Sequence, residues 1–223
     1  EIVDQSASVR PLVKGLVSKS KMGVFSALLV ALGLMASALI NMEVLLIQLA
    51  FLAIYMVYST EPIRLKRIFL MKQVTVAVGG GIACLSAGLA AGTITIQLLY
   101  LTGLYVLFVG GVNPLADLKD IESDLAGRVK TVPNVFGSDF TIRLALTTFT
   151  ASAATTWIGF YRLGFNIALP IIGSIVCIAF VYVLYPLLSH LSDLDYVVKR
   201  IYSRCLPLFF ILQIAVMVGS LPF

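Results

Sequence analysis

Seven long apolar segments dominate this chain and restrict the folds open to it. Each segment is long enough, or nearly so, to cross a bilayer core of about 30 Å. Hydrophobic residues make up 60% of the 223 residues and charged residues only 12%, whereas a soluble domain is usually about 25% charged. We therefore predict an integral membrane protein whose fold is an all-α, polytopic bundle of seven transmembrane helices. The predicted segments are residues 23–41, 43–58, 72–92, 95–112, 139–161, 166–188 and 203–221.

Basic residues predict how these segments are oriented. Fifteen of the sixteen lysines and arginines fall in four clusters, and alternate passage through a membrane places all four on one side. Because an excess of basic residues marks the cytoplasmic side, we expect the clusters in the cytoplasm, with Arg162 and the C-terminus outside. The clusters are Arg10, Lys14, Lys19 and Lys21; Arg64, Lys66, Arg67 and Lys72; Lys119, Arg128, Lys130 and Arg143; and Lys199, Arg200 and Arg204.

The connections between the segments differ on the two sides. The outer ones are very short, near Asn41, near Gly92 and at residues 162–165, and the inner ones are longer and hold nearly all the polar residues. Since loops on a rigid scaffold commonly carry function, we expect the active-site cavity to open on the cytoplasmic face. No soluble basic surface with interleaved aromatic residues is present, so no nucleic-acid partner is expected.

One inner connection, residues 113–133, carries three regularly spaced acids. Asp117, Asp120 and Asp124 have the spacing i, i+3, i+7, which places their carboxylates within an arc of about 60° on one helix face. Asn113 and Pro114 suit the N-cap and first turn of that helix, and Gly127 suits its end.

Like charges one turn apart repel, so a cation is needed if these acids stay ionised and close together. Magnesium is the natural candidate because it takes carboxylate oxygens together with phosphate oxygens. Lys119, Arg128 and Lys130 lie beside the acids and could hold phosphates directly. The alternative is a solvated, charged helix start between two apolar segments, since most charge runs are solvated faces.

A second inner connection, residues 58–67, is also basic. Arg64, Lys66 and Arg67 could anchor to anionic lipid headgroups, or they could reach a diphosphate. The sequence leaves both readings open.

These patterns together resemble the UbiA superfamily of intramembrane prenyltransferases. The acids, followed by Gly127, Thr131, Pro133 and Gly137, resemble the second aspartate-rich motif of that family and its glycine–threonine–proline tail. The loop from Tyr58-Ser59 to Lys66 resembles the family's "YSxPPxRLK" loop, and Arg10-Pro11-Leu12 with Gly15 resembles its "RPLPSG". The run Lys119-Asp120-Ile-Glu-Ser-Asp124 is close to the "KDIEDVEGD" form common in archaeal and quinone-pathway members. This resemblance points to a prokaryotic protein similar to 4-hydroxybenzoate polyprenyltransferases.

Three departures from the family pattern stand out. The family has nine transmembrane helices, and the seven segments here match its helices three to nine. Of its first acidic motif only Glu1 to Asp4 corresponds, and Glu61 replaces the first proline of the "PP" pair. We therefore expect residues 1–223 to form a single prenyltransferase domain that lacks the first two helices or part of the first acidic loop.

The resemblance implies a reaction and assigns residues to it. The expected activity is Mg²⁺-dependent transfer of a prenyl group from an isoprenyl diphosphate to an aromatic acceptor such as 4-hydroxybenzoate, through an allylic carbocation. Asp117, Asp120 and Asp124, with Asp4 from the first motif, are the expected metal ligands. Lys119, Lys130, Arg128, Arg64 and Lys66 are the expected ligands of the diphosphate.

Three alternatives remain. The first is transfer to a non-aromatic lipid acceptor of the geranylgeranylglyceryl phosphate type, and the second is a non-catalytic member of the superfamily. The third is a transporter or a lipid-binding bundle. A transporter should place ionisable residues near the middle of its helices, and the seven segments hold almost none there, which favours the enzyme.

Overall fold

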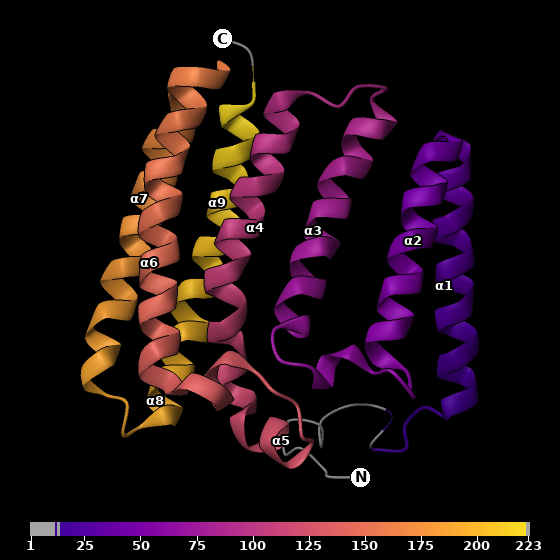
Figure 1. The fold of residues 1–223 in the computed structure, drawn as a ribbon, viewed down its shortest axis with the longest axis horizontal. Coiled ribbons are helices and arrows are strands. Elements are labelled where there is room, and N and C mark those ends of the chain that lie inside the picture. The colour runs from indigo at the N-terminus through magenta and orange to yellow at the C-terminus, as the bar shows by residue number, and fades with distance from the viewer. Residues whose placement is uncertain (1–11, 13, 222–223) are drawn as a thin grey trace.

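The computed structural model describes residue 12 and residues 14–221 (Figure 1). Asp4 and the Arg10-Pro11 pair lie outside the described residues. Every regular element in the described part is helical, so the predicted all-α class is confirmed. Each of the seven predicted segments overlaps one long helix. These helices are α1 (Lys19–Ile40), α2 (Met42–Ser59), α3 (Met71–Ala90), α4 (Ile96–Asp117), α6 (Val132–Leu163), α7 (Ala168–Leu184) and α9 (Leu206–Gly219).

Short helices connect the long ones at one end of the bundle, the lower end in Figure 1. There α5 lies between α4 and α6, and α8 lies between α7 and α9. The short elements are η2 (Leu65–Arg67), η3 (Leu118–Asp120), α5 (Ile121–Ala126), η4 (Tyr185–Ser189), α8 (Leu194–Arg200) and the π-helical turn η5 (Ile201–Cys205).

Six helices in the described chain are long and apolar enough to cross a membrane, and α6 is not one of them. Helix α6 is long but rich in threonine and serine. Their hydroxyls donate to carbonyls of the preceding turn, as from Thr147 to Arg143, from Ser152 to Thr148 and from Thr155 to Ala151. A hydroxyl satisfied within its own helix is tolerated away from water. Since α6 packs between α4 and α7, we infer that it crosses the same layer.

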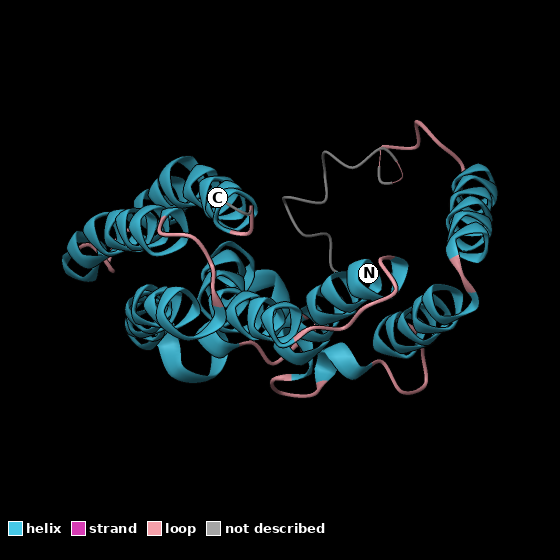
Figure 2. Cartoon of the chain, turned by 90° about the horizontal axis from the view of Figure 1, so that it is seen from above, coloured by secondary structure: helices cyan, strands magenta, loops and turns pink. Residues whose placement is uncertain are grey.

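The long helices stand in a curved row (Figures 1 and 2). Each packs mainly on the next along the chain, from α1 through α2, α3, α4, α6 and α7 to α9. Viewed along the bundle in Figure 2, α1 and α9 lie toward opposite ends of this row. Contacts between sequence neighbours therefore determine most of the arrangement.

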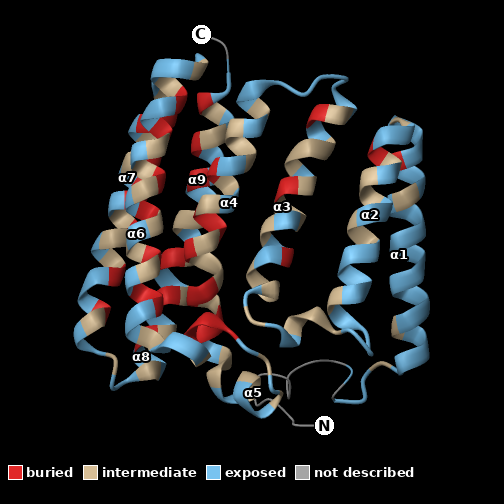
Figure 3. Ribbon diagram, in the orientation of Figure 1, coloured by how far each residue is buried: buried red, intermediate tan, exposed pale blue. Residues whose placement is uncertain are grey.

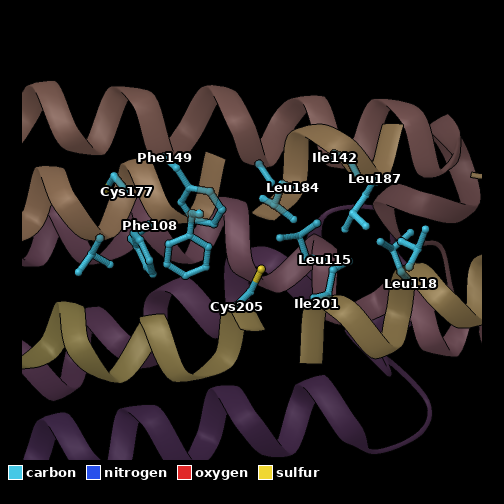
Figure 4. Close-up of a cluster of buried hydrophobic side chains, with 14 of the residues drawn as sticks. Phe108, Leu115, Leu118, Ile142, Phe149, Cys177, Leu184, Leu187, Ile201 and Cys205 are labelled. Carbon is cyan, nitrogen blue, oxygen red and sulfur yellow. The ribbon is translucent and has the colours of Figure 1, made fainter. Parts of the chain in front are cut away.

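The core lies in only part of this row. Buried residues concentrate in α4, α6, α7 and α9 (Figure 3). Phe108, Phe149 and Phe180 form its centre, with ring centroids 4.1–5.3 Å apart, and Leu115, Leu184 and other aliphatic side chains continue it toward the lower end (Figure 4). Helices α1 and α2 each bury a single residue, Ser37 and Val44.

The turns at the upper end are tight, as the sequence predicts. Asn41 alone separates α1 from α2. Its side chain accepts from the backbone N–H of Val44 and donates to the carbonyl of Leu89 at the end of α3, so one residue joins three helices. Gly92 and Gly164 close the other two turns with φ angles of 73° and 75°, a conformation that favours glycine.

Candidate functional site

Helix α4 ends at the first of the three acids. The prediction that a new helix begins at Asn113 and Pro114 is wrong, because α4 continues through both residues to Asp117. Proline lacks an N–H and is disfavoured inside a helix, and here it lies in the last turn. The result is that Asp117 lies at the end of a long buried helix and is itself 2% exposed.

Beyond Asp117 the chain tightens before it becomes helical again. Residues 118–120 form the 3₁₀ turn η3, and Asp120 leaves it with φ −103° and ψ 8° before α5 begins. A 3₁₀ turn advances about 120° per residue rather than 100°, so the three acids do not lie on one continuous α-helix as predicted. Gly127 follows α5 as its C-cap, which confirms the predicted end.

Asp117 and Asp124 converge on one cation, Lys72. The Nζ atom of Lys72 lies 2.7 Å from Oδ1 of Asp117 and 3.7 Å from Oδ2 of Asp124. Gln73 donates from Nε2 to the other carboxylate oxygen of Asp117, at 3.1 Å. Within the described residues Asp120 makes no ion pair, so two of the three predicted acids share a partner.

Lys72 and Gln73 are placed by the start of α3. Leu70, immediately before the helix, has a left-handed backbone with φ 66°, which redirects the chain from η2 into α3. Both polar side chains therefore lie in the first helical turn, next to the end of α4. A lysine at a helix N-terminus is disfavoured by the helix dipole, and the adjacent carboxylates offset that cost.

Three charged groups and two unpaired amide atoms gather at this point. The ammonium of Lys72 contacts two carboxylates, and Asp117 is buried. Two further buried polar atoms, Oε1 of Gln73 and Nδ2 of Asn113, have no hydrogen-bond partner in the described structure. Because buried polar atoms are normally paired, an unpaired amide oxygen beside two carboxylates is suited to a polar, cationic ligand.

These residues fit a magnesium ion in one respect and differ from the prediction in another. Mg²⁺ is usually bound through one or two carboxylates plus substrate phosphates, and Asp117 and Asp124 supply two carboxylates that reach one point. However, the described residues contain no group of three or more Asp, Glu, His or Cys side chains that could hold a metal. The three-aspartate ligand set thus stays a prediction, as does Asp4.

The basic residues of the 58–67 loop are partly engaged with each other and with an acid. Glu61 pairs with Arg64 at 3.0 Å and with Arg67 at 3.2 Å. Partial burial, and then the charges of Arg64 and Arg67, lower the pKa of the Lys66 ammonium. Burial and neighbouring cations both disfavour the charged form of a lysine.

The other predicted diphosphate ligands lie in two places. The Nζ atom of Lys119 lies 5.1 Å from the centroid of the Tyr202 ring, a cation–π contact. Arg128, which has a left-handed backbone with φ 55°, lines a pocket of about 600 Å³ together with Lys130. Apolar side chains form the rest of its wall, and the full lining is Phe69, Leu125, Arg128, Val129, Lys130, Asn134 and Val135.

The residues after this pocket have local structural roles. Thr131 is the N-cap residue of α6, and Pro133 lies in its first turn. Gly137 interrupts the helix with φ 84° and ψ 170°, so residues 132–136 form a short segment before the long part of α6. Only glycine adopts this backbone easily, which accounts for its place in the motif tail.

Sequence reasoning missed the role of Lys72 and Gln73. It counted Lys72 only as part of an inner basic cluster, and it passed over Gln73. The available signal was a polar Lys-Gln pair that opens an apolar segment on the inner side. Their contact with Asp117 joins the start of α3 to the end of α4, 44 residues apart for Gln73 and Asp117, so only the fold reveals it.

Comparison with known proteins identifies the family. Residues 3–198 match the model of the UbiA prenyltransferase family. The chain belongs to this family. It is therefore an integral membrane protein of a prenyltransferase family, and the resemblance drawn from the motifs is confirmed.

Two solved structures share the fold. An apo UbiA homolog from Aeropyrum pernix K1 matches with a TM-score of 0.74 and 19% sequence identity, over 98% of this chain and 79% of that one. A digeranylgeranylglyceryl phosphate synthase, studied for its mechanism in membranes, matches with a TM-score of 0.66 and 21% identity, over 97% and 75%. No curated protein matches the chain significantly in sequence. At these identities the structural likeness shows the fold alone.

Proposed function

We propose that this protein transfers a prenyl group from an isoprenyl diphosphate to an acidic acceptor, within the membrane and with Mg²⁺, through an allylic carbocation. The observation that supports this most is the convergence of Asp117 and Asp124 on one point at the end of α4. Family membership supplies the reaction class. The two converging carboxylates support the proposal that a metal ion and a diphosphate bind at this point.

The acids would hold the metal. Asp117 and Asp124 would be its ligands in this part of the chain, with Asp120 nearby and Asp4 as the proposed ligand from the first motif. When bound, the ion would supply positive charge that stabilises the departing diphosphate. Gln73 keeps Asp117 oriented through its hydrogen bond, and it is a further candidate oxygen ligand because its Oε1 is unpaired.

The basic side chains would hold the diphosphate. Arg128 and Lys130 both line the pocket. Arg64 and Lys66 lie on the loop that leads into α3, and Lys119 lies beside the acids. Cations held in place where negative charge develops stabilise the leaving group.

The acceptor is the finer part of the proposal. An aromatic acid such as 4-hydroxybenzoate is the first candidate, because the motif resemblance to the family points to such acceptors. The second candidate is a lipid of the geranylgeranylglyceryl phosphate type. It is favoured by the structural likeness to a digeranylgeranylglyceryl phosphate synthase.

The membrane has a direct part in this reaction. A prenyl tail gains about 0.8 kcal/mol for each CH₂ that it buries in lipid, so the substrate is naturally concentrated beside the helices. We place the site on the cytoplasmic side, because the predicted excess of basic residues lies at this end of the bundle.

The test is a transfer assay on the full chain in nanodiscs. Radiolabelled geranylgeranyl diphosphate would be supplied with 4-hydroxybenzoate or with geranylgeranylglyceryl phosphate, in Mg²⁺ or in EDTA. We expect a labelled product with one acceptor, in Mg²⁺ only, and strongly reduced product in Asp120→Ala and Asp124→Ala. Undiminished transfer in both variants would overturn the ligand assignment, and no product or diphosphate release under any condition would overturn the activity.

A further inference from the structure

We propose that Lys72 makes the binding of metal and the binding of diphosphate depend on each other. Its ammonium neutralises Asp117 and Asp124 while the site is empty. When a diphosphate arrives, the ammonium turns to the phosphate oxygens and leaves the two carboxylates to the metal. This inference rests on the proposed function, and it concerns the order and coupling of binding rather than the reaction.

The ammonium and the metal need the same oxygens. Lys72 Nζ already lies at contact distance from Asp117 Oδ1, and Asp124 Oδ2 is within 3.7 Å. Mg²⁺ binds carboxylate oxygens at about 2.0–2.1 Å, so an ion that bridged these oxygens would occupy the space of the ammonium. The ammonium of Lys72 therefore competes with the metal for the oxygens of Asp117 and Asp124.

Lys72 has the freedom and the surroundings to change partners. Its side chain is 21% exposed, whereas that of Asp117 is 3% exposed, so the lysine is the mobile member of the pair. A lysine ammonium is a point charge on a flexible stem with three rotatable donors. The start of α3 has no side-chain cap, and the partial positive charge there favours an incoming anion.

The other cations on the preceding loop are less suited to this role. Arg64 and Arg67 are held by Glu61. Lys66 is paired with no acid at 4 Å or less among the described residues. Lys72, in contrast, pairs with both carboxylates of the acidic pair.

The charge balance makes the coupling reciprocal. Without a diphosphate, a metal must displace the ammonium from both carboxylates. Without a metal, a diphosphate must approach two carboxylates, one of them buried. A bound diphosphate draws the ammonium away from the carboxylates, and a bound metal neutralises the carboxylates that repel the diphosphate. Each ligand therefore raises the affinity for the other, and linkage requires the two affinities to rise by the same factor.

The experiment measures Mn²⁺ binding to the full chain in nanodiscs by electron paramagnetic resonance, with and without a prenyl thiodiphosphate that cannot ionise readily. Analogue binding is measured separately with a radiolabel, across a series of Mn²⁺ concentrations. In wild type we expect weak Mn²⁺ binding alone and at least tenfold tighter binding with the analogue. In Lys72→Met we expect Mn²⁺ alone to bind at least tenfold tighter than in wild type, and the coupling factor to fall by at least tenfold.

Two further variants keep the test decisive. Lys72→Arg keeps the charge, and its guanidinium can contact both carboxylates at once. We therefore expect Mn²⁺ alone to bind at least tenfold weaker than in wild type, so a clear result remains if Lys72→Met does not fold. Lys199→Met removes an exposed lysine of α8 and should change neither affinity nor coupling.

The outcomes separate this inference from the proposed function. Unchanged or weaker Mn²⁺ binding in folded Lys72→Met, or unchanged binding in Lys72→Arg, overturns the inference. If the analogue tightens Mn²⁺ binding by the same factor in wild type and in Lys72→Met, the inference about Lys72 is wrong, whereas the proposed function stands. If wild type binds no analogue at any Mn²⁺ concentration, the proposed function fails, and the coupling fails with it.

Discussion

Helices α4, α6, α7 and α9 bury a continuous core around Phe108, Phe149 and Phe180, whereas α1 and α2 bury one residue each. We call the first group the packed half and α1 to α3 the thin half. Within the thin half, α2 meets α3 through polar contacts such as Gln48 to Ser86 at 2.9 Å and through the close approach of Phe51 to Gly79. Helix α3 in turn packs on α4 of the packed half.

The candidate site lies where the two halves meet. The packed half provides Asp117 and, just beyond α4, Asp124, and the thin half provides Lys72 and Gln73. The comparison shows that the acids follow a helix, α4, that buries seven residues, whereas their counter-ion stands on α3, which buries three.

Removing a core ring should have the largest effect. Phe149→Ala leaves a cavity among Phe108 and Phe180 and should cost roughly 3 kcal/mol of unfolding free energy. Phe25→Ala in α1 removes a ring that is 57% exposed and should change stability by less than about 0.5 kcal/mol. Unfolding in bicelles measures both, and equal losses would contradict the division into two halves.

Neutralising the buried acid should come next. Asp117→Asn keeps the shape of the side chain but removes its charge from the ion pair with Lys72. We expect transfer to fall by about a hundredfold, or about 2.7 kcal/mol. The matched control is Asp139→Asn, an exposed acid paired with Arg143, which should keep its activity. Comparable kcat/KM losses in the two variants would argue against a site at the junction.

Adding a methyl group to a glycine tests packing in both halves. A Cβ atom at Gly111 would meet the side chains of Thr148 and Phe149, so Gly111→Ala should cost about 1–3 kcal/mol. A Cβ atom at Gly33 in α1 would meet nothing within 4 Å, so Gly33→Ala should be neutral or slightly stabilising. The midpoints of thermal unfolding of the two variants, compared with wild type, would show the difference.

The smallest effect is expected for a single polar contact within the thin half. Gln48→Ala removes the hydrogen bond to Ser86, and hydrogen bonds between membrane helices average about 0.6 kcal/mol. Gln213→Ala removes an exposed glutamine of α9 and should have no measurable effect. Hydrogen exchange of α2 amides should rise in the first variant only. If the second shows the same rise, the contact has no special role.

The sequence predicted the helices well because hydropathy and length decide which segments can cross a membrane. It failed at two boundaries, where local signals were misleading. Asn113 and Pro114 have the composition of a helix start, yet tertiary packing around Leu115 and Leu118 carries α4 past them. The start of α6 was placed at 139 rather than at Val132, because Gly137 separates a short first segment from the apolar part.

The candidate site was predicted in part for the same reason. The spacing of the acids is a local pattern and was readable, and the family resemblance that it suggested is confirmed. The 3₁₀ turn after Asp117 was not readable, and it determines which acids share a partner. Lys72 could not be assigned, since its contact with Asp117 depends on how α3 packs against α4.

The most direct test is a structure of the full chain in lipid with a prenyl thiodiphosphate and Mn²⁺, collected with anomalous scattering at the manganese edge. We expect a manganese peak within bonding distance of Asp117 and Asp124, and Lys72 turned from both carboxylates toward a phosphate oxygen. A manganese peak elsewhere, with Lys72 still paired to Asp117 and the diphosphate bound away from this junction, would contradict the account.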